Sequence, residues 1–186
     1  DAWTNVLLEP LGHRVELSVT REQVTYFSTN DIDDLRRGQF PVWIWMDDPS
    51  FYGFPEFGLG GSFKASEDCG GPVVDPDRRT FDADPVMESR VREFVDRLIG
   101  DRRPTPRSTT CLYTLTADRD FVLDRLPDAP QIVVALGAAH AFKFAAWFGR
   151  QLAALAMGGA AGAELKPFSI ARQALREPAD RAAWLV

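Results

Sequence analysis

Cysteine, excess positive charge and long apolar runs are all scarce in this sequence. Only two of its 186 residues are cysteines, Cys69 and Cys111, too few for a disulfide framework. The 21 Lys and Arg residues are outnumbered by 27 Asp and Glu, and a formal net charge of −6 gives no sign of a nucleic-acid surface. No stretch is long and apolar enough to predict a membrane span, and no signal peptide is recognised, so the cytoplasm is the expected compartment.

What the sequence does contain is enough apolar material for a core, at 45% hydrophobic and 11% aromatic residues. Alternating or apolar runs bounded by turn residues predict a series of short strands. Their regular spacing favours a largely antiparallel sheet. The predicted strands are Val15–Thr20, Val24–Phe27, Pro41–Met46, Tyr52–Pro55 and Ser62–Ser66, with the charged segment Asp31–Gly38 as a surface turn or short helix.

The second half of the chain mixes helices and strands. The apolar periodicity of Pro85–Ile99 predicts an amphipathic helix. Cys111–Thr116 alternates like a strand, Gln131–Leu136 has the valine-rich run of a buried strand, and Gly137 ends it. We further expect a linker at Pro104–Pro106, a short apolar run at Phe121–Leu123, a turn at Pro127–Pro130, a long apolar helix from His140 toward Met157, and a polar surface tail from Gln173 onward.

A strand, a tight turn and a helix N-terminus form a natural seat for an electron-rich group, because the first helical amides are unpaired. His140 and Lys143 are expected in that first helical turn. Cations normally favour the other end of a helix, so a positive cluster here indicates an anionic partner.

Four ordered segments carry a resemblance to a known family: Tyr52–Pro55, Cys111–Thr114, Phe121–Asp124 and His140–Phe144. They resemble the C-terminal half of monomeric sarcosine oxidase and N-methyltryptophan oxidase, which are FAD-dependent amine oxidases. The resemblance runs from Asp1 to Arg172. It implies oxidation of a secondary or N-methylated amino acid to an imine, which hydrolyses, with O2 reduced to H2O2.

The family opens with a glycine-rich turn that binds the FAD pyrophosphate, and no G-x-G-x-x-G occurs here. We therefore expect a C-terminal piece of a longer enzyme, whose partner would be an N-terminal FAD-binding half, and we expect the piece alone to hold no stoichiometric FAD and to be inactive. The expected fold class is α+β: a mostly antiparallel substrate domain (11–130), incomplete FAD-domain elements (1–10 and 131–172) and a tail (173–186).

Two residues are implied to act at the flavin. Cys111 matches the cysteine that carries FAD through a thioether to its 8α-methyl group; the competing interpretation is an ordinary half-buried strand thiol. Lys64 matches the lysine that assists reaction with O2, because a fixed cation stabilises superoxide as its charge appears. A solvated strand lysine is the alternative.

The remaining candidates come from the same resemblance. Lys143 matches a lysine that pairs with the substrate carboxylate, and its aromatic neighbours Phe142 and Phe144 predict a buried setting. A lysine whose stem covers apolar surface is the alternative. His140 matches a histidine at the flavin, although a structural histidine fits nearly as well. Tyr52 and Tyr113 match active-site tyrosines, but buried tyrosines that only donate hydrogen bonds are common.

The chain also departs from the family pattern. Ala139 and Ala141 flank His140 where the family has glycines, and each extra methyl group could crowd the cofactor. Asp68 stands four residues after Lys64, where the family has histidine. Asp68 either pairs with Lys64 or faces the substrate and favours a cationic group, which is the reading we prefer. No residue is assigned to a metal.

Two other functions stay open at this stage. The chain could be a substrate-binding module that is not catalytic, inert without an FAD-binding half. It could also belong to a flavin amine dehydrogenase that avoids O2, against which Lys64 argues weakly.

Overall fold

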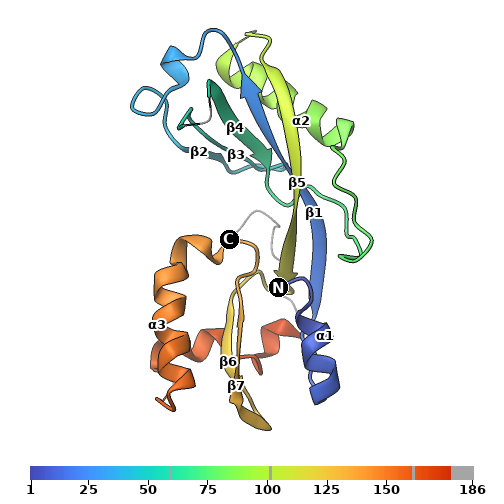
Figure 1. The fold of residues 1–186 in the computed structure, drawn as a ribbon, viewed down its shortest axis with the longest axis vertical. Coiled ribbons are helices and arrows are strands. Elements are labelled where there is room, and N and C mark those ends of the chain that lie inside the picture. The colour runs from blue at the N-terminus through green and yellow to red at the C-terminus, as the bar shows by residue number, and fades with distance from the viewer. Residues whose placement is uncertain (59, 101, 161, 177–186) are drawn as a thin grey trace. The chain divides into compact units, whose positions relative to one another are not determined.

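The computed structural model describes residues 1–58, 60–100, 102–160 and 162–176 (Figure 1). The chain forms two compact units: Asp1–Val19 with Tyr113–Val186, and Thr20–Leu112. Each unit is described by itself below. The assignment of 1–10 and 131–172 to an FAD-binding domain remains a prediction.

A five-stranded sheet organises the Thr20–Leu112 unit, with the strand order β2-β3-β4-β1-β5. Adjacent strands pair antiparallel from β2 to β3, from β3 to β4 and from β4 to β1. The predicted α+β class with a mostly antiparallel sheet is confirmed. The strands are β1 (Leu17–Ser28), β2 (Trp43–Trp45), β3 (Phe51–Phe54), β4 (Ser62–Glu67) and β5 (Thr105–Thr116).

Helix α2 (Pro85–Ile99) covers one face of this sheet and has the predicted bounds (Figure 1). It begins at Asp84, whose carboxylate accepts hydrogen bonds from the amides of Val86 and Met87, with a proline at the first helical position. Its apolar stripe enters the core of the unit, so the opposite face of the sheet is not covered by α2. The buried core residues are Phe27, Ile32, Leu35, Phe51, Phe63, Ala65, Val91, Phe94 and Val95.

The other unit is built on the antiparallel pair β6 (Val122–Leu126) and β7 (Ala129–Leu136). Alternation sends Val122 and Leu126 into one apolar cluster and Leu123 into a second one, with Phe121 and Phe148. Around the strands lie α1 (Thr4–Leu8), α3 (Ala145–Ala156) and the 3₁₀ helices Glu9–Leu11, Ala141–Phe144, Ala163–Phe168 and Gln173–Leu175; a further 3₁₀ helix, Asp33–Leu35, belongs to the sheet unit.

Several predicted strand boundaries are wrong. The two strands expected between Val15 and Phe27 are one continuous strand, β1. The strand expected at Pro41–Met46 shrinks to three residues, because this edge strand has one neighbour and its side chains are largely exposed. The expected linker Pro104–Pro106 is also wrong, since β5 begins at Thr105. Likewise, β7 already begins at Ala129, inside the predicted turn.

The predicted helices and surface segments need corrections too. The long helix expected from His140 is a 3₁₀ helix followed by α3, which ends at Ala156. Ile32 and Leu35 are buried, so the charged segment Asp31–Gly38 is not wholly a surface turn. Leu175, predicted in the surface tail, is 3% exposed and packs in an apolar cluster. The rest of that tail, 177–186, lies outside the described residues.

Candidate active site

Lys64 lies on the sheet face opposite α2, directly across from Tyr26 on β1 and Phe54 on β3. Its ammonium nitrogen is 5.3 Å from the ring centre of Tyr52 and 5.1 Å from that of Phe54. Burial lowers the pKa of Lys64, and Cys111 opposes that shift. Aromatic faces therefore hold this cation without neutralising its charge.

Cys111 lies on β5, and its strand position places it on the same face as Lys64. Ser108, three residues earlier, donates a hydrogen bond to Glu88 of α2 at 2.8 Å, so its side chain faces the helix. Because side chains alternate along a strand, Cys111 points to the other face. Burial and then Glu22 raise the pKa of the Cys111 thiol, while Lys64 and Arg79 lower it.

Three of the predicted residues, Lys64, Tyr52 and Cys111, thus share one face of one sheet. Sequence reasoning missed Glu22 and Arg79, which act electrostatically on Cys111. Glu22 falls in a polar run that separates two predicted strands, where no alternation marks it. No pattern pointed to Arg79, which belongs to an irregular segment.

Asp68 follows the last residue of β4, so strand alternation alone does not place its side chain. It is half-buried, and its amide donates to the carbonyl of Ser50 at 2.9 Å. Burial and Cys111 shift the pKa of Lys64, and Asp68 does not contribute to that shift. Both alternatives for Asp68, pairing with Lys64 or facing the substrate, stay predictions.

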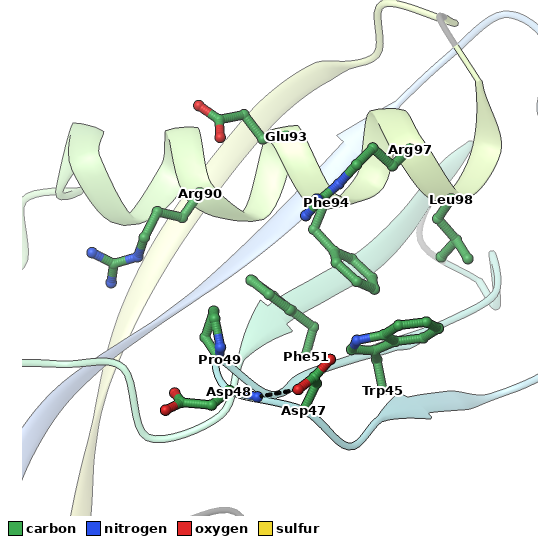
Figure 2. Close-up of a pocket in the computed structure, with 10 residues that line it drawn as sticks. All are labelled: Trp45, Asp47, Asp48, Pro49, Phe51, Arg90, Glu93, Phe94, Arg97 and Leu98. Atoms are coloured by element: carbon green, nitrogen blue, oxygen red, sulfur yellow. Dashed lines mark hydrogen bonds between the residues drawn. The ribbon is translucent and has the colours of Figure 1, made fainter.

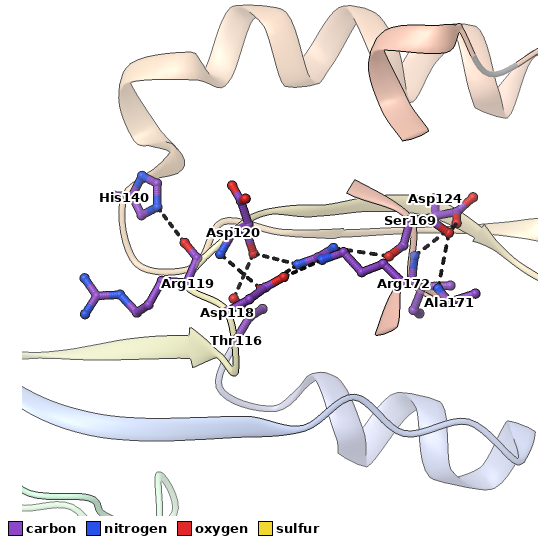
Figure 3. Close-up of polar contacts among 10 residues, drawn as sticks. Thr116, Asp118, Arg119, Asp120, Asp124, His140, Ser169, Ala171 and Arg172 are labelled. Carbon is purple, nitrogen blue, oxygen red and sulfur yellow. Dashed lines mark hydrogen bonds and ion pairs between the residues drawn. The ribbon is translucent and has the colours of Figure 1, made fainter. Parts of the chain in front are cut away.

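The second unit holds His140 at the end of a tight turn. Its Nε2 lies 3.1 Å from the carbonyl oxygen of Arg119, which can only accept, so Nε2 carries the proton (Figure 3). Nδ1 is buried and has no hydrogen-bond partner among the described residues. Burial lowers the pKa of His140 although the bond to Arg119 opposes this, which favours a neutral imidazole with a free acceptor atom.

The turn before His140 contains one departure from the family pattern, Ala139. The His140 amide donates to the Gly137 carbonyl at 2.9 Å, closing a turn in which Ala138 and Ala139 have φ angles of 44° and 74°. Such left-handed backbone costs an L-residue roughly 1–2 kcal/mol. A Cβ atom at Gly137 would lie 2.7 Å from that of Ala141, so the methyl group of Ala141 makes glycine necessary there.

Lys143 is exposed, and the predicted burial of its surroundings is wrong. Phe142 is 94% exposed and Phe144 is 42% exposed. A 3₁₀ turn points successive side chains in three directions, so the three residues cannot all face the unit's core. The Lys143 ammonium lies 5.5 Å from the centre of the Phe144 ring.

A buried ion pair supports the turn that holds His140 (Figure 3). Arg172 donates to both carboxylate oxygens of Asp118, at 2.7 and 2.8 Å, and to the Asp120 carbonyl at 3.1 Å. Burial raises the pKa of Asp118, but the hydrogen bonds and charge of Arg172, together with backbone amides such as that of Asp120, outweigh it and hold that pKa below its usual value. Arg172 was recognised only as an end point of the resemblance, and Asp118 was missed.

The predicted residues divide between the two units. Tyr52, Lys64, Asp68 and Cys111 belong to the Thr20–Leu112 unit, whereas Tyr113, Ala139, His140, Ala141 and Lys143 belong to the other. Tyr113 is half-buried at the C-terminal end of β5.

Two features of the chain fit an FAD cofactor. The unpartnered Nδ1 of His140 is a buried acceptor that a ligand donor could satisfy. The thiol of Cys111 is a nucleophile that could form a thioether bond; burial and Glu22 raise its pKa, and the nearby cations Lys64 and Arg79 oppose that rise.

A separate pocket of about 530 Å³ lies between α2 and the segment joining β2 to β3 (Figure 2). Its apolar floor includes Phe51 and Phe94, whose rings stack at 4.4 Å, and its rim carries Arg97 and Asp47. It lies on the α2 side of the sheet, and none of the predicted site residues line it.

Within the described ranges, no helix combines the length and apolar character that a membrane span requires. Among the same residues, no three or more His, Cys, Asp and Glu side chains are grouped to hold a metal ion.

Comparisons with known proteins now place the chain. The family described as FAD dependent oxidoreductase matches residues 1–155. Monomeric sarcosine oxidase from Bacillus sp. (strain NS-129) is 31% identical over 183 residues, covering 96% of this chain and 47% of the relative. Peroxisomal sarcosine oxidase from Homo sapiens is 33% identical over 178 residues, covering 91% of this chain and 45% of the relative.

Solved structures agree with these sequence relatives. The open form of NikD, an unusual amino acid oxidase essential for nikkomycin biosynthesis, matches with a TM-score of 0.71 and 27% identity, covering 90% of this chain and 46% of NikD. Iminodiacetate oxidase from Chelativorans sp. BNC1, at 18% identity and a TM-score of 0.70, shares the fold. The chain spans about half the length of the relatives it matches. It belongs to the family of FAD-dependent oxidoreductases, among its sarcosine oxidase-like members.

Proposed function

We propose that this chain is the C-terminal part of a flavin-dependent oxidase. The oxidase converts a secondary or N-methylated amino acid to an imine, with O2 reduced to H2O2. The observation that carries the proposal is the Lys64 ammonium, held by Tyr52 and Phe54 on the sheet face that also bears Cys111. Sarcosine oxidases among its relatives support the substrate class.

FAD, when bound, supplies the two-electron acceptor for the carbon–hydrogen bond next to nitrogen and the electrons that reduce O2. Cys111 is the residue that would hold it covalently, and His140 would offer it an acceptor through Nδ1. The other residues of this chain act on substrate and charge.

Lys64 has the role of a preorganised cation. Its ammonium group already sits against two aromatic faces, so no reorganisation is needed when negative charge develops on oxygen. No carboxylate of the described residues contributes to the shift of the Lys64 pKa, so the charge is available to that oxygen. This is the feature that favours an oxidase over a dehydrogenase.

Lys143 and Asp68 are proposed to select the substrate. The exposed Lys143 ammonium is free to reach a substrate carboxylate, as its family counterpart does. Asp68 would favour a substrate with an additional cationic group. Tyr52 and Tyr113 are proposed to border the reacting amine.

The test uses the enzyme that contains this chain and a panel of N-methyl amino acids that includes sarcosine and N-methyltryptophan. We expect H2O2 production that catalase abolishes, and an Asp68→His variant whose kcat/KM ratio shifts toward sarcosine. Substrate oxidation by an artificial electron acceptor without H2O2 would instead identify a dehydrogenase. Absence of oxidation with every amine and acceptor would leave the binding module as the correct description.

A further inference from the structure

Glu22 is a buried acid that the proposed chemistry does not use. It is 2% exposed. Its carboxylate accepts hydrogen bonds from the Thr20 hydroxyl at 2.5 Å and from the Gly71 amide at 3.1 Å. A Cβ atom at Gly71 would lie 2.0 Å from the Arg21 carbonyl oxygen, so the glycine lets this segment approach β1 closely. No cation of the described chain forms an ion pair with Glu22.

The strand register places Glu22 across from Cys111. Strands β1 and β5 are neighbours and run in opposite directions (Figure 1). The hydroxyls of Thr25 and Ser108 are 2.9 Å apart, and the Arg107 guanidinium lies 5.3 Å from the ring centre of Tyr26. Both contacts fit one antiparallel register. Three residues further along it, Glu22 stands opposite Cys111, where side chains on one face are neighbours.

The charges around the thiol oppose one another. After burial, Glu22 is the next largest cause that raises the pKa of Cys111, while Lys64 on β4 and Arg79 beyond it lower that pKa. Burial also raises the pKa of Glu22, the Thr20 and Gly71 hydrogen bonds limit the rise, and the nearby Asp68 and Glu67 add to it.

We propose that Glu22 restrains Cys111: facing the thiol from the neighbouring strand, it keeps Cys111 protonated and slow to react, against the pull of Lys64 and Arg79. A neutral thiol resists oxidation and alkylation, so the restraint preserves the residue until its electrophile arrives. That this electrophile is FAD rests on the proposed function. The restraint itself does not.

The test measures alkylation of Cys111 in the 186-residue chain by iodoacetamide, followed by peptide mass spectrometry as a function of pH. The thiolate sulfur forms a bond to carbon, iodide leaves, and the thiol proton passes to solvent. Glu22→Gln retains an oxygen for the Gly71 amide but removes the charge. We expect the midpoint of its profile at lower pH and roughly three- to tenfold faster alkylation below that midpoint. Lys64→Met should shift the midpoint the other way.

Glu93→Gln, an exposed substitution on α2 that removes the same charge, should leave the profile unchanged. An unchanged or higher midpoint in Glu22→Gln would overturn the proposal. If that variant does not fold, carboxyl-carbon NMR of Glu22 in the wild-type chain decides. The Glu22 signal should shift a second time as Cys111 titrates, and Cys111→Ser should abolish that step. A Glu22 signal that is the same with and without the thiol would also overturn the restraint. None of these readouts involves flavin, so they stand apart from the oxidase proposal.

Discussion

The predicted site residues are held by a sheet in one unit and by a turn in the other. Lys64 and Cys111 lie on regular strands whose opposite face is anchored by the aromatic core under α2. His140 follows two alanines in left-handed backbone and depends on one carbonyl of a neighbouring turn. The difference indicates that sheet geometry fixes side-chain direction through alternation, whereas the turn needs separate supports, each of which can be removed.

In each unit, one buried phenylalanine ring contacts several aromatic neighbours. Removing the ring of Phe94 or of Phe121 should lower the free energy of unfolding more than any of the other substitutions. The ring centre of Phe94 lies 4.4 Å from that of Phe51, on which it stacks. The ring centre of Phe121 lies 4.7 Å from that of His140 and 5.1 Å from that of Phe148. We expect Phe94→Ala and Phe121→Ala each to lower the free energy of unfolding by about 3–5 kcal/mol in urea titrations. Phe142→Ala, at a side chain that is 94% exposed, is the matched control and should change it by less than about 0.5 kcal/mol.

The same pair of variants sharpens the comparison through His140. Because burial lowers its pKa, Phe121→Ala should raise that pKa toward the ordinary value in NMR titrations, whereas Phe94→Ala should not. Equal His140 titrations in both variants would show that Phe121 does not support the turn.

Breaking the Asp118–Arg172 ion pair should cause the next largest loss of folding stability, because its side chains are only 8% and 11% exposed. Asp118→Ala leaves Arg172 buried without its partner, and we expect a loss of about 3 kcal/mol in urea unfolding. Arg36→Ala, in an ion pair exposed at 56% and 86%, should cost less than about 1 kcal/mol.

The pH dependence of this pair has a definite sign. The folded-state pKa of Asp118 is lowered, so its contribution is complete at neutral pH and disappears as pH falls below about 4 toward that lowered pKa. Asp118→Asn should therefore flatten the acid limb of a stability–pH curve. An acid limb as steep as that of the wild type would assign the dependence to other carboxylates.

Replacing the alanines on either side of His140 by glycine should change the free energy of unfolding least. Ala139→Gly relieves left-handed strain but adds chain entropy to the unfolded state, for a net gain of about 0.5–1 kcal/mol in thermal or urea unfolding. Ala141→Gly offers no such relief and should lose a similar amount, because Ala141 opens a 3₁₀ helix. A loss in both variants would mean that the turn is not strained at Ala139.

The sequence predicted best where one local rule decides the structure. The bounds of α2 follow from Asp84 as a cap, Pro85 at the first helical position and an apolar period that reaches Ile99. Local rules failed where tertiary neighbours decide. Pro106 enters β5 because the partner strand continues, and His140 precedes a 3₁₀ turn because the left-handed alanines redirect the chain.

The candidate site likewise has features that local sequence rules predicted and features that only tertiary contacts determine. Alternation was enough to put Cys111 and Tyr113 on one side of a strand, but only the paired strands bring Lys64 and Glu22 to Cys111. Aromatic neighbours in the sequence suggested that Lys143 is buried, whereas a 3₁₀ turn exposes Phe142 beside it. Contacts between residues distant in the sequence, such as Asp118 with Arg172, leave no local pattern to recognise.

The most direct test of the proposed oxidase compares the two half-reactions of Lys64→Met by stopped-flow absorbance in the enzyme that contains this chain. The cation is needed when negative charge develops on oxygen, so reoxidation by O2 should slow by about 10²-fold or more while reduction by substrate changes little. Lys143→Met is the matched control and should instead weaken substrate binding. Equal slowing of both half-reactions in Lys64→Met would contradict the role of this sheet face in reaction with O2.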